Sequence, residues 1–176
     1  MRRTDVRMAT WTTFATEAPD MAALAERRFT ASGLALLGTL RADGFPRISP
    51  LEPMVDGDSL VLHDGYMVLG MMPGSTKALD LRRDPRMALH TATVDKKLTE
   101  GDAKLWGHGI EVTDEAALQA LADRHEALTG YKLEPGTFHM FLPDVLGVST
   151  VRLADDALWV DTWKPGAAPR TVKVDG

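Results

Sequence analysis

The segment 73–83 carries the residue types of an anion-binding site. Ser75 and Thr76 place two hydroxyl groups at the predicted start of a helix, and Lys77 follows in its first turn, where an acidic residue is usually preferred. The first backbone N–H groups of a helix have no partner within it, and the helix dipole adds partial positive charge there. These groups together favour a bound phosphate. The alternative interpretation is an ordinary capped helix with a solvated lysine.

Arg47 and Ser49 are two positions apart in a segment predicted to be a strand, so their side chains share one face. They could donate hydrogen bonds to a planar ligand or to its phosphate, or they could be polar residues on the wet face of an edge strand. Three prolines in the same segment remove backbone donors, at positions 46, 50 and 53. The strand is therefore expected to lie at a sheet edge, to bend, or to face a ligand.

The remaining candidate residues are histidines and tryptophans. None of the five histidines has the spacing of a metal site, and the chain has no GxSxG motif, so the sequence predicts neither a metal centre nor a serine hydrolase. His63 and His90 lie in or at the end of predicted strands and could face a pocket. Trp159 and Trp163 share one face of a predicted strand, which favours core or interface packing over stacking on an aromatic cofactor.

Composition limits the class of protein. The 176 residues predict one domain, and 25 acidic against 20 basic side chains give a net charge of −5. This balance argues against nucleic-acid binding or binding to an acidic membrane surface. Cysteine is absent, which excludes disulfides and thiol chemistry. No apolar run is long enough to span a membrane and no secretory signal is recognisable, so a cytoplasmic protein is expected.

The elements that position these residues are mostly short strands. Helices are predicted from Pro19 to a stop at Gly33, over 76–83, and from a Thr113 cap to Gly130. Asp-Gly turns join strands at 34–40, 45–55 and 59–63 into an antiparallel meander, followed by a loop at 64–74. Further strands are predicted at 87–94, 103–112, 138–142, 145–153 and 157–163. We expect a mainly β (α+β) domain over 11–164, with tails at 1–10 and 165–176.

At this point the residues resemble a known family. The run 34–40, the Asp43-Gly44 turn, Pro46-Arg47-Ile48-Ser49-Pro50 and the lysine-bearing segment 75–86 follow one another as in the pyridoxamine 5′-phosphate oxidase-like proteins, the FMN-binding split-barrel group. That group includes flavin and deazaflavin oxidoreductases that use FMN or F420. The resemblance implies an antiparallel six-stranded split β-barrel with peripheral helices. It also implies a homodimer with the cofactor sites at its interface.

The resemblance assigns roles to individual residues. It implies that Lys77, with Ser75 or Thr76, holds the cofactor phosphate and that Arg47 and Ser49 run along the phosphate and ring. His63 matches the strand end beside the ring, and regions often supplied by the partner chain match Trp106 and Trp163.

The sequence also departs from true pyridoxamine phosphate oxidases. Glu52 follows Leu51 where their Arg-x-x-x-Leu-Lys pattern has lysine, and their C-terminal Arg-x-His signature is missing. The expected function is therefore hydride transfer between FMN, or F420, and another small organic substrate. The alternatives are a non-catalytic cofactor-storage protein or a haem-binding protein, for which His63 or His90 could supply an axial ligand.

Overall fold

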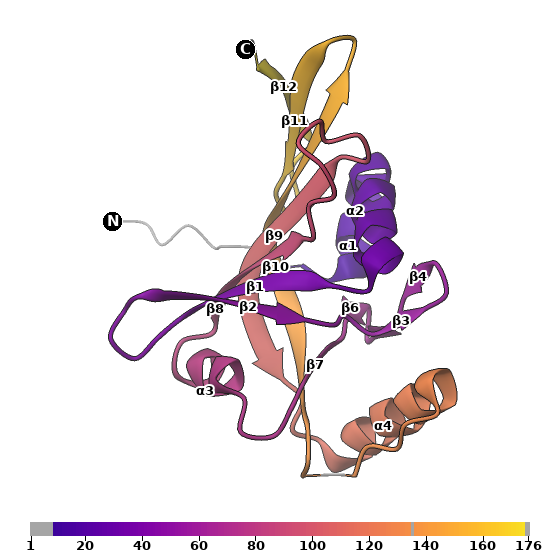
Figure 1. Cartoon of the computed structure of the whole chain (residues 1–176), viewed down its shortest axis with the longest axis vertical. Coiled ribbons are helices and arrows are strands. Elements are labelled where there is room, and N and C mark those ends of the chain that lie inside the picture. Colours follow the sequence, from indigo (N-terminus) through magenta and orange to yellow (C-terminus); the bar gives the residue numbers. More distant parts are fainter. Residues whose placement is uncertain (1–8, 135, 175–176) are drawn as a thin grey trace.

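The computed structural model describes residues 9–134 and 136–174, in which one strongly curved antiparallel sheet dominates (Figure 1). Along the sheet the strands follow the order β12 (Arg170–Val174), β11 (Ala157–Trp163), β10 (His139–Ala154), β9 (Asp102–Glu111), β8 (Arg86–Thr91), β1 (Ala35–Leu40) and β2 (Pro46–Leu51). A further strand, β7 (Leu69–Met71), pairs with the start of β10. All of these pairings are antiparallel.

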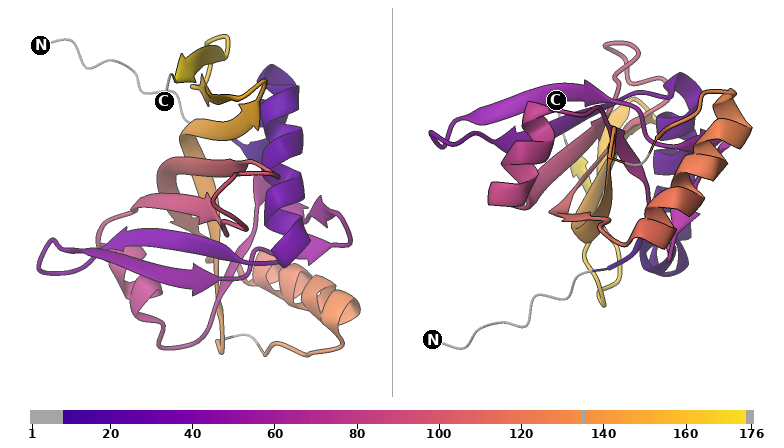
Figure 2. Two further views of the ribbon diagram at one scale, coloured as in Figure 1. Left: turned by 45° about the horizontal axis from the view of Figure 1, so that its top comes forward. Right: turned by 90° about the horizontal axis from the view of Figure 1, so that it is seen from below.

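Six of these strands close into a barrel with one opening. In the order β2, β1, β8, β9, β10 and β7 each strand bonds to the next, and no ladder joins the two end strands. An isolated bridge links Leu69 of β7 to Pro53, which lies just after β2. The prediction of a six-stranded split barrel is therefore confirmed. As predicted from its prolines, β2 is an edge strand, and its free edge faces the opening. Strands β11 and β12 continue from the far end of β10 as an arm beyond the barrel (Figure 2).

The chain leaves the main sheet after β2. Strand β3 (Val55–Asp56) pairs with β4 (Ser59–Leu60), and β5 (Leu62–His63) pairs with β6 (Tyr66–Met67), each as a separate two-stranded sheet. The predicted hairpin at Asp56-Gly57-Asp58 is therefore confirmed, but its place in a continuous meander with β2 was wrong. Pro50 and Pro53 lack the backbone N–H groups that would continue the ladder where the chain bends away. The loop predicted at 64–74 was also wrong, since it contains β6 and β7.

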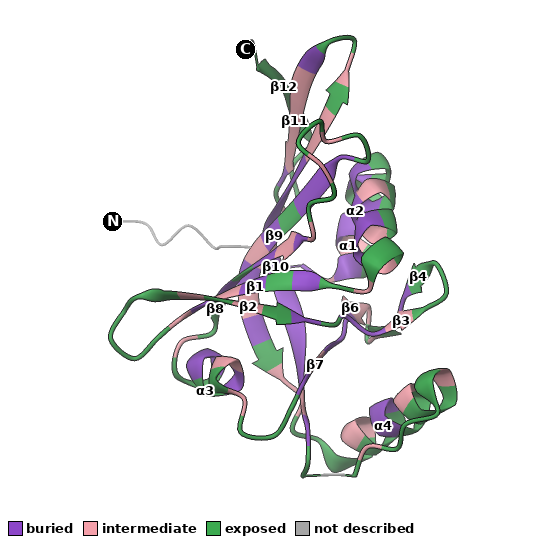
Figure 3. Ribbon diagram, in the orientation of Figure 1, coloured by how far each residue is buried: buried purple, intermediate pink, exposed green. Residues whose placement is uncertain are grey.

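Four helices surround this barrel in the described ranges. α1 (Trp11–Glu17) was not predicted, whereas α2 (Pro19–Ser32) ends at a left-handed Gly33 as expected. Both pack on the main core (Figure 3), where Trp11 lies edge-on to Phe14 with ring centroids 5.3 Å apart. α3 (Thr76–Arg83) has the predicted bounds. α4 (Glu115–Thr129) is capped by Asp114 rather than by Thr113 and covers a second apolar cluster outside the barrel.

Two further expectations changed. The strands predicted at 138–142 and 145–153 are one strand, β10, with a bulge between Val145 and Gly147. The C-terminal segment predicted as a tail contains β12, which pairs with β11. Most of the predicted N-terminal tail, residues 1–8, lies outside the described residues, and Ala9 pairs with Val145. No helix in the described ranges is both long and apolar enough for a membrane span.

Candidate functional site

The opening of the barrel brings the lysine of α3 to the free edge of β2. The turn after β7 leads directly into α3, and the Lys77 Nζ donates a hydrogen bond of 2.7 Å to the carbonyl oxygen of Pro50. Burial of the Lys77 side chain lowers its pKa, and the nearby Glu52 carboxylate opposes that shift. A lysine ammonium has three N–H donors, so the bond to the Pro50 carbonyl leaves two of them for an anion.

The N-terminus of α3 has an unused capping residue. Ser75 occupies the N-cap position, but its side chain makes no capping hydrogen bond. By contrast, the Asp114 carboxylate accepts a 2.8 Å bond from the Ala117 N–H at the start of α4. The first turn of α3 has no acidic residue. The Ser75 hydroxyl and the first N–H groups of α3 therefore suit an external acceptor such as a phosphate oxygen.

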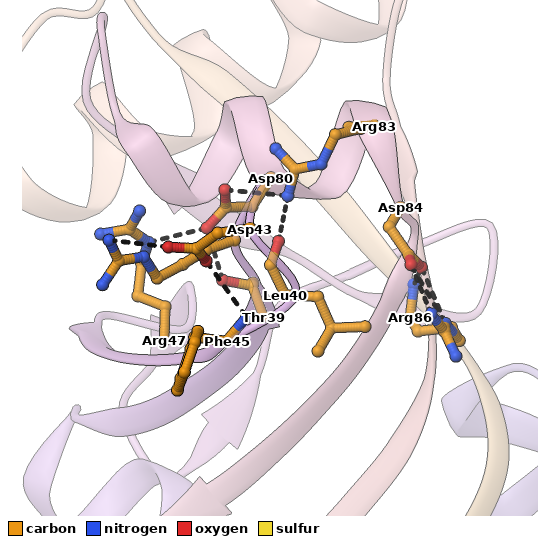
Figure 4. Close-up of polar contacts among 10 residues, drawn as sticks. Thr39, Leu40, Asp43, Phe45, Arg47, Asp80, Arg83, Asp84 and Arg86 are labelled. Carbon is orange, nitrogen blue, oxygen red and sulfur yellow. Dashed lines mark hydrogen bonds and ion pairs between the residues drawn. The ribbon is translucent and has the colours of Figure 1, made fainter.

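Asp80 is the centre of the polar contacts on the neighbouring face of α3 (Figure 4). Its carboxylate is 3% exposed and accepts hydrogen bonds from Thr39 (3.0 Å), from the Arg47 Nε (2.7 Å) and from Arg83 (3.2 Å). Burial by itself would raise the pKa of Asp80, but the bonds from Arg47, Thr39 and Arg83 outweigh it and the pKa is lowered. Asp80 thus fixes the Arg47 guanidinium against α3, beside the helix N-terminus.

A pocket of about 330 Å³ lies between this face of α3 and the β1–β2 turn. Its lining includes Arg47 from β2 and Thr76 from α3. Strand β2 alternates as predicted, so Ser49 lies on the same face as Arg47 and directly precedes Pro50. Arg47, Ser49, Ser75, Thr76 and Lys77 are therefore gathered around one end of the barrel opening.

The other predicted site residues lie elsewhere in this chain. His63 is on the β5–β6 hairpin, which contacts α1 and β10, and its Nε2 lies 3.7 Å from the Asp64 carboxylate. Trp106 is half-buried on the outer face of the sheet, over Gly147. Trp163 is fully buried.

The prediction that Trp163 binds a cofactor was wrong. Its ring lies 5.0 Å from that of Phe14, and its Nε1 donates to the Glu17 carboxylate at 3.1 Å. A side chain enclosed in this way by its own chain has no surface left for a ligand. The alternative prediction, that Trp163 packs in the core, is confirmed.

The sequence reasoning did not single out Asp80. A signal was present, because Asp80 lies on α3 among the buried positions Ala78 and Leu81, and a carboxylate among apolar positions requires partners. Three arginines near the end of α3 are likewise paired. Arg82 binds Glu111 and the His139 Nδ1, Arg83 binds Asp80 and the Leu40 carbonyl, and Arg86 binds Asp84.

Comparison with known proteins identifies the fold. No protein-family model and no curated protein sequence matches the chain. Among solved structures, it is similar to a pyridoxamine 5′-phosphate oxidase-related, FMN-binding protein from Nostoc punctiforme, with a TM-score of 0.61, 13% identity, and coverage of 97% of this chain and 100% of the other. PhzG from Burkholderia lata, in complex with tetrahydrophenazine-1-carboxylic acid, gives a TM-score of 0.54 at 14% identity, covering 94% and 89%.

A haem-binding protein from Mycobacterium smegmatis is also similar, with a TM-score of 0.53 at 20% identity over 81% of this chain and 58% of the other. The chain therefore has the split-barrel fold of the pyridoxamine 5′-phosphate oxidase-related proteins, as the sequence resemblance implied.

Proposed function

We propose that this protein is an oxidoreductase that binds FMN, with the phosphate held at the N-terminus of α3. The observation that carries the proposal is the uncapped Ser75 beside the partly buried Lys77 ammonium. Ser75, Thr76 and Lys77 would bind phosphate oxygens, and Arg47, fixed by Asp80, would add positive charge from β2. The FMN-binding protein with this fold supports the choice of ligand.

Bound FMN would supply hydride transfer, which no amino-acid side chain can perform. The residues of this chain would hold the phosphate, orient the flat ring along the edge of β2 and shield it from water. FMN is favoured over F420 because Arg82 and Arg86, which could have received an acidic tail, are neutralised by Glu111 and Asp84. Arg83 contacts Asp80, whose single negative charge it shares with Arg47.

The test is a titration of the purified full chain with FMN, followed by flavin fluorescence and by the visible absorption spectrum. Saturable binding with a shifted flavin spectrum is the expected result. Anaerobic turnover of the reduced holoprotein with small organic acceptors then separates an enzyme from a storage protein. Failure to bind FMN at millimolar concentration contradicts the proposal.

Haem binding is the second candidate, because His90, which the sequence singled out as a possible axial ligand, has a suitable arrangement. The His90 Nδ1 lies 2.6 Å from the Thr91 carbonyl oxygen. When Nδ1 is the donor, Nε2 is the unprotonated nitrogen and can bind a metal. A haem-binding protein shares the fold. A Soret band in protein mixed with haemin, lost in His90→Ala but retained in His63→Ala, would favour this function over FMN.

We further propose that two copies pair through the outer face of the sheet and share the cofactor sites. Leu36, Ile48 and Ile110 expose apolar side chains on this face, and Ile48 is 75% exposed. Trp106 lies on the same face, since Ala88 is its register partner and also that of Gly38 in β1. Burial of such a surface between identical subunits is favourable. Sedimentation at micromolar concentration should show a dimer that Ile48→Asp converts to a monomer.

A further inference from the structure

A second and larger cavity, of about 1000 Å³, lies on the other side of the barrel opening. Its walls come from α4, from residues 131–134, from the connection between α2 and β1, from residues 52–55 after β2, and from the strand β7. Volumes of this size belong to sites for small organic molecules. This cavity is distinct from the smaller pocket beside α3, with which it shares no lining residue.

The interior of this cavity is apolar and adaptable. Four of the nine methionines of the chain line it, at positions 54, 71, 72 and 140. Met140 is 1% exposed, and Phe138 and Met54 are also buried. Methionine side chains are flexible and polarizable, so a wall of this kind adjusts to apolar ligands of varied shape.

Charged groups are confined to the rim. Glu52, Lys132 and Glu134 are the charged side chains of the lining, and all three are exposed. Lys132 is paired with Glu134 at 2.8 Å, so the rim has one net negative charge. The His125 Nδ1 lies 3.0 Å from the Tyr131 carbonyl oxygen. No buried cation in this lining could receive an anionic group, so the lining favours a ligand without negative charge.

The cavity adjoins the proposed phosphate site. Met72 and Pro73 belong to its wall, and Gly74 alone separates them from Ser75. On the opposite side Glu52 is close enough to affect the pKa of Lys77. A molecule in this cavity therefore lies beside whatever is held at the N-terminus of α3.

We propose that this methionine-lined cavity binds an uncharged, largely apolar organic molecule. Its role as the substrate compartment rests on the proposed function, because it adjoins the site assigned to FMN. The binding itself requires only the cavity.

The test uses N-phenyl-1-naphthylamine, a neutral dye that fluoresces in apolar surroundings, titrated into the full chain without FMN. Gly70→Leu is the blocking variant. Gly70 lines the cavity, has no left-handed φ, and a Cβ there would lie 3.7 Å from the Met140 Sδ, an ordinary contact. Leu128→Trp blocks the cavity from α4. Ala120→Leu is the control and places a leucine at an exposed position of α4 outside the cavity.

We expect saturable binding to the wild type and to Ala120→Leu, and at least a tenfold loss of affinity in both blocking variants, with unchanged circular dichroism. If one blocking variant does not fold, the other decides. Absence of saturable binding, unchanged affinity in a folded blocking variant, or tighter binding of the anionic 8-anilinonaphthalene-1-sulfonate overturns the proposal. Dye binding without FMN binding refutes only the proposed function. FMN binding without dye binding refutes only the proposal that the cavity binds an uncharged apolar molecule.

Discussion

Replacing Lys77 with methionine tests the phosphate site with little disturbance of the fold. The change keeps the length and apolar character of the stem and removes the ammonium. Two effects on the free energy of unfolding oppose each other. The variant loses the bond from Nζ to Pro50, which is exposed so that water can replace it, and it removes a cation from the first turn of α3, which recovers about 0.3–1 kcal/mol. The stability of the free protein should therefore change by less than about 1 kcal/mol.

The affinity for FMN should change far more. A hydrogen bond to a charged group contributes about 1.5–3 kcal/mol, which corresponds to a roughly 10- to 150-fold increase in Kd. The assay is quenching of flavin fluorescence in parallel titrations of the wild type, Lys77→Met and Lys97→Met. Lys97 is the matched control because it is exposed in the connection between β8 and β9.

One pattern supports the reasoning, namely weak binding by Lys77→Met with wild-type stability and unchanged binding by Lys97→Met. Equal Kd values for Lys77→Met and the wild type would refute the assignment of the phosphate to α3. Equal losses in both lysine variants would show that only the overall charge matters.

Three further predictions concern stability, measured by denaturant unfolding. Arg47, Thr39 and Arg83 hold the pKa of Asp80 below the usual value of about 3.9. The ionised Asp80 carboxylate therefore stabilises the fold fully above that pH, and this stabilisation is lost as the pH falls through the lower pKa of the folded state. Asp80→Asn should lower the free energy of unfolding by about 1.5–3 kcal/mol at pH 7 and remove part of this acid sensitivity. An unchanged dependence of stability on pH would argue against this role of Asp80. Gly107→Ala should cost at least about 2 kcal/mol, because its Cβ would lie 2.0 Å from a backbone oxygen of β10. Gly38→Ala, with 3.5 Å of space, should cost under about 1 kcal/mol, and equal costs would contradict this packing. Asp114→Ala should cost about 1 kcal/mol, whereas Ser75→Ala should cost little because Ser75 makes no cap; the reverse order would show that Ser75 does cap α3.

Local signals in the sequence were sufficient for the elements that carry the phosphate site. Helix α3 has the bounds that Ser75 and the Asp84-Pro85 pair indicate, and β2 alternates as its prolines and polar residues suggest. These features depend on proline geometry and side-chain periodicity, both of which act over a few residues. The residue types of Ser75, Thr76 and Lys77 therefore allowed an anion site to be predicted there, with a solvated lysine as the alternative.

Long-range packing decided the rest. Three residues of β7 carry too little periodicity to be recognised, yet their pairing with β10 places one border of the barrel opening. The spacing of Trp163 favours core or interface packing without naming a partner, and only the tertiary structure shows that Phe14 of α1 packs against it. Asp80 acquires its role when Thr39 and Arg47 approach from two other strands. Such contacts join residues that are distant in the chain, and no local pattern specifies which partners meet.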